Sequence, residues 1–228
     1  MKHAISLMLI LLLLVSLVGC AAAPAPATET QVITDQDGFE VTLPKKIERI
    51  VVCDILPLPS VLAVFFDSAE KIVGISGTSM NAAENSLLGQ LYPEILDAET
   101  SFIDGSTVNA EELMKLQPDV VFYNASRREL GEQLRNAGFP AVAISVNKWE
   151  YDSIETLNQW IALLSEIFPE NAKTEVVENY SRQVYDLVQG RVADIPERER
   201  VLFLYQYSET NMLTSGAKFF GQWWADAI

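Results

Sequence analysis

Histidine is almost absent from this chain of 228 residues, since the only one is His3. His3 lies in an N-terminal segment that we expect to be removed, so the mature chain has no imidazole. This absence excludes Ser-His-Asp and Cys-His catalysis, and also histidine-ligated zinc or nickel sites. The sequence also lacks a Gly-x-Ser-x-Gly elbow and a phosphate-binding loop. We therefore expect no catalytic residues, no metal site and no cofactor, and an extracytoplasmic hydrolase is the disfavoured alternative.

Cysteine and positive charge are also scarce. The two cysteines are Cys20 and Cys53, so lipidation of Cys20 would leave no intrachain disulfide. Lysine and arginine number 16 against 31 acidic residues, a net charge of -15. Loss of residues 1–19 removes Lys2 and no acid, which leaves 15 basic residues against 31 and a charge of -16. Such a surface repels phosphate backbones, so nucleic-acid binding is not expected.

The N-terminus carries the only long apolar run, residues 5–18, after a short positive start at Lys2. It ends in Leu17-Val-Gly-Cys20, which looks like the lipobox of bacterial lipoproteins. The alternative, an uncleaved membrane anchor, would need about 20 apolar residues. Residues 21–30 are rich in Ala, Pro and Thr and are typical of a flexible tether. We expect an extracytoplasmic protein, periplasmic or on the outer face, anchored to the cell membrane through a lipidated Cys20.

The pattern after residue 30 predicts an α/β fold. Residues 31–44 read as a hairpin around Asp37-Gly38. Apolar runs at 50–53, 71–76, 119–123 and 141–146 alternate with helical patterns at 57–66, 110–116 and 127–137. Residues 77–85 are expected to form a loop, 86–92 a weak helix and 100–103 a short strand. This alternation favours a parallel sheet with helices on both faces.

Residues 151–194 predict two consecutive helices, broken at Pro169 and ended near Gly190. A new strand signal follows at Val201–Tyr205. A strand after a helical crossing suggests a second lobe and a ligand cleft between two lobes. The pattern alone leaves open whether these helices belong to one larger α/β domain.

The ordered set of segments resembles the substrate-binding lipoproteins of iron-complex (siderophore) and cobalamin ABC importers. The resemblance is carried by residues 34–44 (TDQDGFEVTLP), 48–52 (ERIVV), 71–75 (KIVGI), 109–113 (NAEEL), 116–121 (LQPDVV) and 220–224 (FGQWW). It implies two Rossmann-like lobes with parallel sheets, joined by a rigid helix at about residues 170–194, with the ligand between them.

The expected division follows from the pattern and the resemblance together. It comprises a signal peptide (1–19), a lipidated cysteine and tether (20–30), an N-terminal α/β lobe (31–150), a helical connector (151–195) and an incomplete second lobe (196–228). Since family members carry a full second lobe, the chain is interpreted as C-terminally truncated, with most of that lobe missing.

Ligands of open parallel sheets bind beyond the carboxyl ends of the strands. This rule selects candidate residues from the loops that follow the predicted strands: Asp54, Leu56, Ser79, Asn124, Arg127 and Arg128. The two arginines suit a carboxylate or an anionic chelate; alternatively, they begin a helix and pair with Glu129 and Glu132. Aromatic side chains of the second-lobe segment suit planar ligands or belong to a core: Tyr205, Tyr207, Trp223 and Trp224.

The resemblance adds one further residue. Glu111 matches the glutamate by which the first lobe of proteins in this family docks on the permease. Without the resemblance, Glu111 is simply an acid in the first turn of a helix, where the helix dipole favours negative charge. The expected function is capture of an iron-siderophore or related metal complex for an ABC importer, by a monomer that binds the permease. Cobalamin or haem binding, or a non-functional truncated fragment, are the alternatives.

Overall fold

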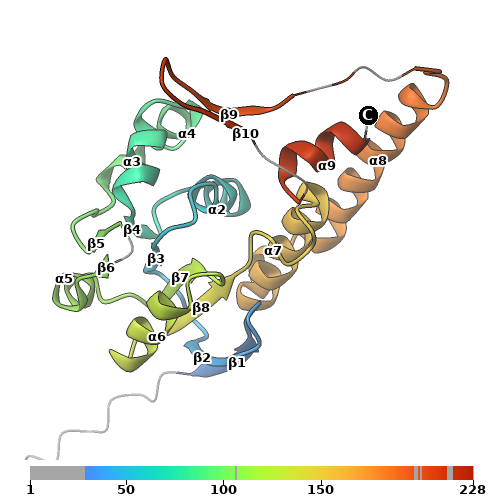
Figure 1. Ribbon diagram of the computed structural model, residues 1–228. Helices are drawn as coiled ribbons and strands as arrows, with labels where there is room; N and C mark the ends of the chain where they lie inside the picture. The colour runs from blue at the N-terminus through green and yellow to red at the C-terminus, as the bar shows by residue number, and fades with distance from the viewer. Residues whose placement is uncertain (1–28, 106, 198–199, 201, 215–217, 228) are drawn as a thin grey trace, which may run out of the picture.

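The computed structural model describes residues 29–105, 107–197, 200, 202–214 and 218–227. Its centre is a parallel sheet of four strands in the order β4-β3-β7-β8 (Figure 1). The strands are β3 (Ile50–Val52), β4 (Ile72–Ile75), β7 (Val120–Asn124) and β8 (Ala141–Ile144). β4, β7 and β8 each follow a helical segment, as the alternating sequence pattern predicted. The predicted α/β class is therefore confirmed.

Two hydrophobic cores lie on the two faces of the sheet, because successive side chains of a strand point to opposite faces. Ile50 and Val52 belong to one core. That core is completed by α2 (Leu58–Phe66) and α7 (Ser153–Ile167). Val51 and Val121 belong to the other, together with α5 (Ala110–Lys115) and α6 (Arg128–Asn136). Burial on both faces explains why these strands are apolar without a polar alternation.

An antiparallel hairpin of β1 (Thr30–Thr34) and β2 (Glu40–Pro44) precedes the sheet. Its turn contains Gly38 at φ +91°, in the region that favours glycine. The turn is attached to the edge strand β8, since the backbone N–H of Gln36 donates to the carbonyl of Ala143 at 3.1 Å. The hairpin thus covers an edge that would otherwise be open.

The segment between β4 and α5 contains the first correction. Residues 77–85 were expected to form a loop, but α3 (Gly77–Glu84) is a helix. Its N-cap is Ser76, whose side chain accepts the backbone N–H of Ser79. The segment continues through α4 (Leu87–Leu91), the 3-10 turn η1 (Pro93–Asp97), and the short antiparallel strands β5 (Ile103–Asp104) and β6 (Thr107–Val108).

Two long helices follow the sheet. α7 packs into the first core, and the indole N–H of Trp160 donates to the carbonyl of Ser145 at 2.6 Å. The 3-10 turn η2 (Pro169–Asn171) separates it from α8 (Thr174–Val192), the helix predicted at residues 170–194. α8 contacts α7 and has no buried residue.

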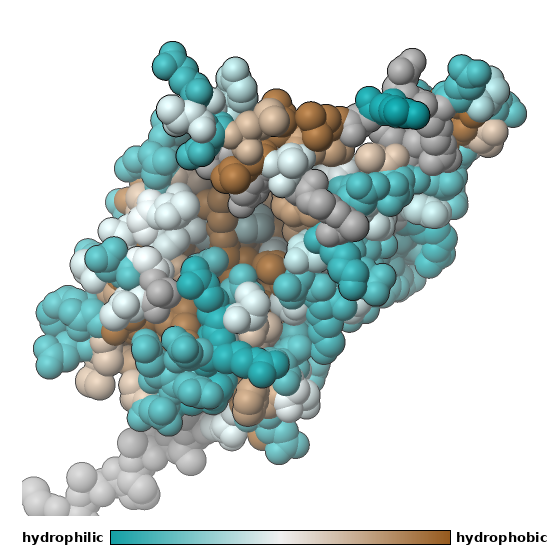
Figure 2. Space-filling model, in the orientation of Figure 1, coloured by the Kyte–Doolittle hydropathy of each residue, from teal (hydrophilic) through white to brown (hydrophobic). Residues whose placement is uncertain are grey.

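The C-terminal segment forms a hairpin and a helix. β9 (Leu204–Tyr207) pairs antiparallel with β10 (Met212–Thr214), and α9 is Phe220–Ala227. Only one strand was predicted here, at residues 201–205. The structure has a second one, because Ser208–Asn211 closes a turn that pairs β9 with β10. Figure 2 shows hydrophobic side chains gathered where Figure 1 draws this hairpin. Its exposed apolar residues include Leu204, Tyr207, Met212 and Leu213.

Candidate functional site

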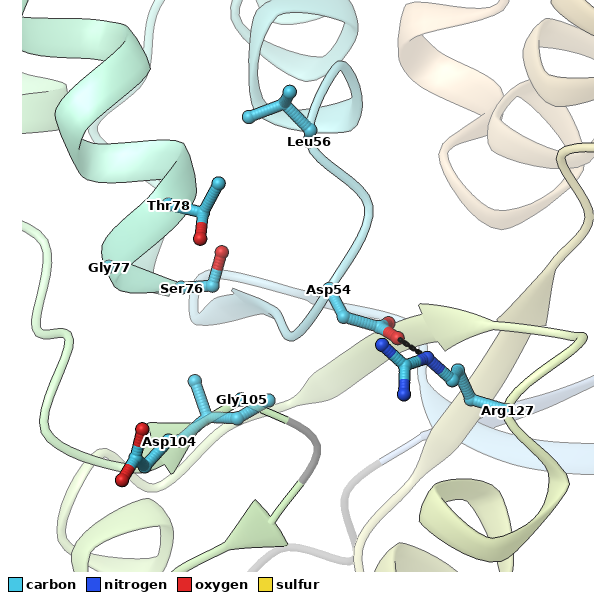
Figure 3. Close-up of a pocket in the computed structure, with 9 residues that line it drawn as sticks. Asp54, Leu56, Ser76, Gly77, Thr78, Asp104, Gly105 and Arg127 are labelled. Atoms are coloured by element: carbon cyan, nitrogen blue, oxygen red, sulfur yellow. Dashed lines mark ion pairs between the residues drawn. The ribbon is translucent and has the colours of Figure 1, made fainter. Parts of the chain in front are cut away.

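A cavity of about 490 Å³ lies beyond the carboxyl ends of β3, β4 and β7. This is where the strand-end rule predicts a ligand. Residues that follow β3, β4, β5 and β7 contribute to it, as Figure 3 shows. The lining residues are Asp54, Leu56, Ser76, Gly77, Thr78, Ile103, Asp104, Gly105 and Arg127.

One wall of the cavity is the N-terminus of α3. Ser76 and Gly77 stand at the beginning of this helix, and its first turn contains no acidic residue. Backbone N–H groups and the positive end of the helix dipole therefore face the cavity from this side. The hydroxyl groups of Ser76 and Thr78 lie near each other on the same wall (Figure 3).

Ser79 is not part of that wall, which corrects its predicted place in the cleft. Its side chain is buried, and the Ser76 hydroxyl donates to the Ser79 hydroxyl at 3.0 Å. The segment predicted as a loop is the helix α3, and Ser79 is one of the residues that this helix buries. Ser76 and Thr78 line the cavity in its place. One sequence signal was available, since a serine directly after a strand is a good N-cap for a helix.

The opposite wall carries Arg127, whose Nε lies 3.3 Å from Oδ2 of Asp54 (Figure 3). The Asp54 side chain is 8% exposed and that of Arg127 is 50% exposed. Oδ1 of Asp54 accepts the backbone N–H of Asn124 at 3.0 Å. Burial raises the pKa of the Asp54 carboxyl, and the Asn124 hydrogen bond and the Arg127 charge offset only part of that rise.

Asn124 and Arg128 lie beside the cavity rather than on it. The side-chain oxygen of Asn124 accepts the N–H and the hydroxyl of Ser126, at 3.0 and 2.8 Å. Arg128 lines a neighbouring cavity of about 370 Å³, and Arg127 lines both. The structure thus brings Asp54, Leu56 and Arg127 together and leaves Asn124 and Arg128 at one side. Their roles in binding a ligand stay predictions.

The aromatic candidates lie elsewhere. Tyr207 is exposed, and the indole N–H of Trp224 donates to the hydroxyl of Ser153 at the start of α7, at 2.9 Å. Trp223 lines a separate cavity of about 460 Å³ together with Trp149. Of these aromatic residues, Tyr207, Trp223 and Trp224 do not line the strand-end cavity, and their role in binding a ligand stays a prediction. The Tyr205 side chain lies outside the described residues.

Three further predicted positions can be placed. Glu111 is exposed in the first turn of α5, whose N-cap is Asn109, and Glu112 pairs with Lys115 at 2.7 Å. Cys53 is fully buried, and burial raises the pKa of its thiol, as expected for an inert core cysteine. Cys20 lies outside the described residues.

In the described part of the chain, no three His, Cys, Asp or Glu side chains gather as metal ligands. Within the same part, no helix has the length and hydropathy needed to cross a membrane.

Comparisons with known proteins agree with this fold. No protein-family model matches the chain. The molybdate-binding protein MolA of Haemophilus influenzae is 30% identical over 190 residues, which are 75% of this chain and 52% of MolA. The chain thus spans about half the length of the curated relative that it matches.

Two solved structures support the same assignment. A periplasmic solute-binding protein of Veillonella parvula matches with a TM-score of 0.68 and 29% identity, covering 77% of this chain and 52% of its own. The structure of H. influenzae MolA bound to molybdate matches with a TM-score of 0.61 and 28% identity, covering 75% and 56%. These relatives are described as binding proteins. The resemblance is therefore confirmed at this level: the chain is similar in sequence and in fold to periplasmic solute-binding proteins, one of which serves an ABC transporter.

Proposed function

We propose that this chain captures an anionic metal complex outside the cytoplasm and delivers it to the permease of an ABC importer. The observation that carries the proposal is the strand-end cavity, where Arg127 faces the N-terminus of α3. A guanidinium, helical N–H groups and the hydroxyl of Thr78 are all donors to oxygen atoms of an anion. We propose that the site binds its ligand and does no chemistry, since none of these groups is a nucleophile with an adjacent base.

A ferric siderophore or a similar chelate is the ligand class that we favour. A chelate already fills the coordination sphere of its metal, so the protein needs only donors to the oxygen-rich outer surface. A cavity of about 490 Å³ is also much larger than a single oxoanion. Cobalamin or haem fits less well, because Trp223 and Trp224 lie outside this cavity and provide no flat aromatic wall there.

A simple oxoanion is the second candidate, and one specific observation favours it. The curated relative at 30% identity is named for binding molybdate. An oxoanion would sit between the amide groups at Gly77 and Thr78 and the guanidinium of Arg127. It would use the same donors as the chelate, in a smaller part of the cavity.

The remaining parts of the proposal concern location and partner. We propose that a lipidated Cys20 anchors a monomer to the membrane, and that exposed Glu111 docks on the permease. Glu111 is the better docking residue of the two neighbouring acids, since the charge of Glu112 is partly neutralised by Lys115. The alternative of a non-functional fragment is decided by whether the folded chain binds any ligand.

Isothermal titration calorimetry of residues 20–228 tests the function. The titrants are ferric siderophores of the catecholate and hydroxamate types, molybdate, haem and cobalamin. We expect saturable binding of a ferric siderophore, with weaker or no response to haem and cobalamin. Binding of molybdate alone would select the second candidate. A folded chain that binds none of them would contradict the function and support the fragment alternative.

A further inference from the structure

Asp54 holds a buried carboxylate at the edge of a site that we propose binds anions. One of its oxygens is accounted for, since Oδ1 accepts the N–H of Asn124 at 3.0 Å. Oδ2 is buried and has no hydrogen-bond donor in the described part of the chain. Its nearest cation is Nε of Arg127 at 3.3 Å, an ion pair without hydrogen-bond geometry. A buried acceptor that lacks a donor is uncommon and calls for an explanation.

The orientation of Arg127 provides that explanation. Arginine has five N–H donors in a fixed planar fork, one on Nε and four on the terminal nitrogens. Figure 3 shows the Nε edge at Asp54 and the terminal nitrogens on the side of the cavity. The edge that carries two parallel donors, which suits a bidentate anion, is therefore left for a ligand.

We infer that Asp54 is a positioning residue: it holds the Nε edge of Arg127 and so presents the terminal nitrogens of this arginine to the anion. The inference rests on the proposed function. Ligand binding at the terminal nitrogens would also bring Nε–H into line with Oδ2 and complete the missing hydrogen bond. Without Asp54, a half-exposed arginine side chain is free to turn to solvent or toward Asp104 across the cavity.

Repulsion between the Asp54 carboxylate and a bound anion would weaken binding, whereas the positioning of Arg127 by Asp54 strengthens it. Oδ2 is shielded from the cavity, because it is buried while the guanidinium beside it is half exposed. The positive guanidinium then lies between the carboxylate and the ligand, so each negative group is closer to the positive charge than to the other negative group. The charged or titratable groups around Asp54 are Arg127 at the N-cap of α6, Asp104 across the cavity and the buried thiol of Cys53. We therefore expect positioning to outweigh repulsion.

The test compares Asp54→Asn with Asp104→Asn by calorimetry, with ferric siderophores and molybdate as probes. Each variant removes one negative charge from the same cavity, but only Asp54 contacts Arg127. We expect Asp54→Asn to weaken binding of the probe by about tenfold, whereas Asp104→Asn should tighten it. Binding to the natural chain should also weaken as the pH falls through the pKa of Asp54, and this dependence should be lost in Asp54→Asn. Equal or tighter binding by Asp54→Asn would overturn the inference.

A second measurement needs no ligand. NMR relaxation of the Arg127 side chain should show an Nε–H bond whose motion is restricted by the ion pair in the natural chain and freer in Asp54→Asn. Circular dichroism confirms that both proteins are folded. If the natural chain binds neither probe but the side-chain mobility differs as expected, the proposed function fails while Asp54 still positions Arg127. If the mobility of Arg127 is equal in the two proteins, the positioning inference fails whatever binds.

Discussion

The carboxylate of Asp35 joins the N-terminal hairpin to the central sheet, since its Oδ2 accepts the backbone N–H of Ala143 at 3.0 Å. Its Oδ1 accepts the N–H groups of Asp37 and Phe39 within the turn, at 3.0 and 2.8 Å. A single buried side chain thus satisfies donors in two elements 108 residues apart. This arrangement explains how a hairpin can close the edge of β8.

Replacement of Asp35 by alanine should therefore destabilise the protein by about 2–4 kcal/mol, because a buried N–H on β8 loses its acceptor and two turn N–H groups lose theirs. Urea unfolding followed by circular dichroism measures the change. Asp37→Ala is the matched control, because the Asp37 side chain is exposed and only its backbone N–H contacts Asp35. A loss no greater than that of the control would contradict the role given to Asp35.

Trp160 offers a second test of the core. Trp160→Phe keeps an aromatic ring but removes the indole donor to the Ser145 carbonyl, and should cost about 2–3 kcal/mol of unfolding free energy. Trp224→Phe removes an indole hydrogen bond from an exposed side chain and should cost less than about 1 kcal/mol. Thermal unfolding of both variants measures the difference. Similar losses of unfolding free energy in the two variants would show that burial of the indole donor does not determine how much the hydrogen bond contributes to stability.

Two helical glycines should respond to alanine with opposite signs. A Cβ at Gly131 in α6 would meet the ring of Tyr123 at 2.5 Å, whereas a Cβ at Gly190 in α8 would meet nothing within 4 Å. Gly131→Ala should destabilise by about 1–3 kcal/mol through overpacking. Gly190→Ala should stabilise by about 0.5–1 kcal/mol, since alanine favours a helix. Chemical denaturation measures both, and a stabilising Gly131→Ala would contradict the tight packing of α6 on β7.

Asp54 should make stability depend on pH in an unusual direction for a carboxylate. Its pKa is raised in the folded protein, mainly by burial, so the folded state binds the proton more readily than the unfolded state. The linked stability is fully present below the ordinary pKa of aspartate, about 3.9, and is lost as the pH rises through the folded pKa. The natural chain should therefore gain stability relative to Asp54→Asn as the pH is lowered from about 7 toward 4. Urea unfolding of both proteins across this range measures the difference, and a relative loss would contradict the burial of Asp54.

Much of the first lobe could be predicted from the sequence, because its signals are local and strong. The apolar runs at β3, β7 and β8, and the Asp37-Gly38 turn, each favour one structure. α3 could not be predicted in the same way, because it buries only Ser79 and Ala83 and has almost no apolar face. The pairing of β9 with β10 was missed because it depends on contacts across a turn rather than on either strand alone.

The strand-end rule selected loops that do lie together, since Asp54, Leu56 and Arg127 line one cavity. That this cavity binds the ligand stays a prediction. Which side chain of a loop faces the cavity depends on local backbone direction, and so Ser79 was chosen where Ser76 and Thr78 lie. The contact between Asp54 and Arg127 joins two loops 73 positions apart in the numbering. No sequence pattern here encodes that contact.

The most direct test of the central claim is equilibrium dialysis of the mature chain, Arg127→Gln and Arg128→Gln against ferric siderophores and molybdate. Both variants lose one positive charge at neighbouring positions, but only Arg127 lines the strand-end cavity. If that cavity is the anion site, Arg127→Gln weakens binding by tenfold or more, about 1.4 kcal/mol or above, and Arg128→Gln has a much smaller effect. Equal losses in the two variants, or an unchanged affinity in Arg127→Gln, would contradict the claim that Arg127 and the N-terminus of α3 hold the ligand.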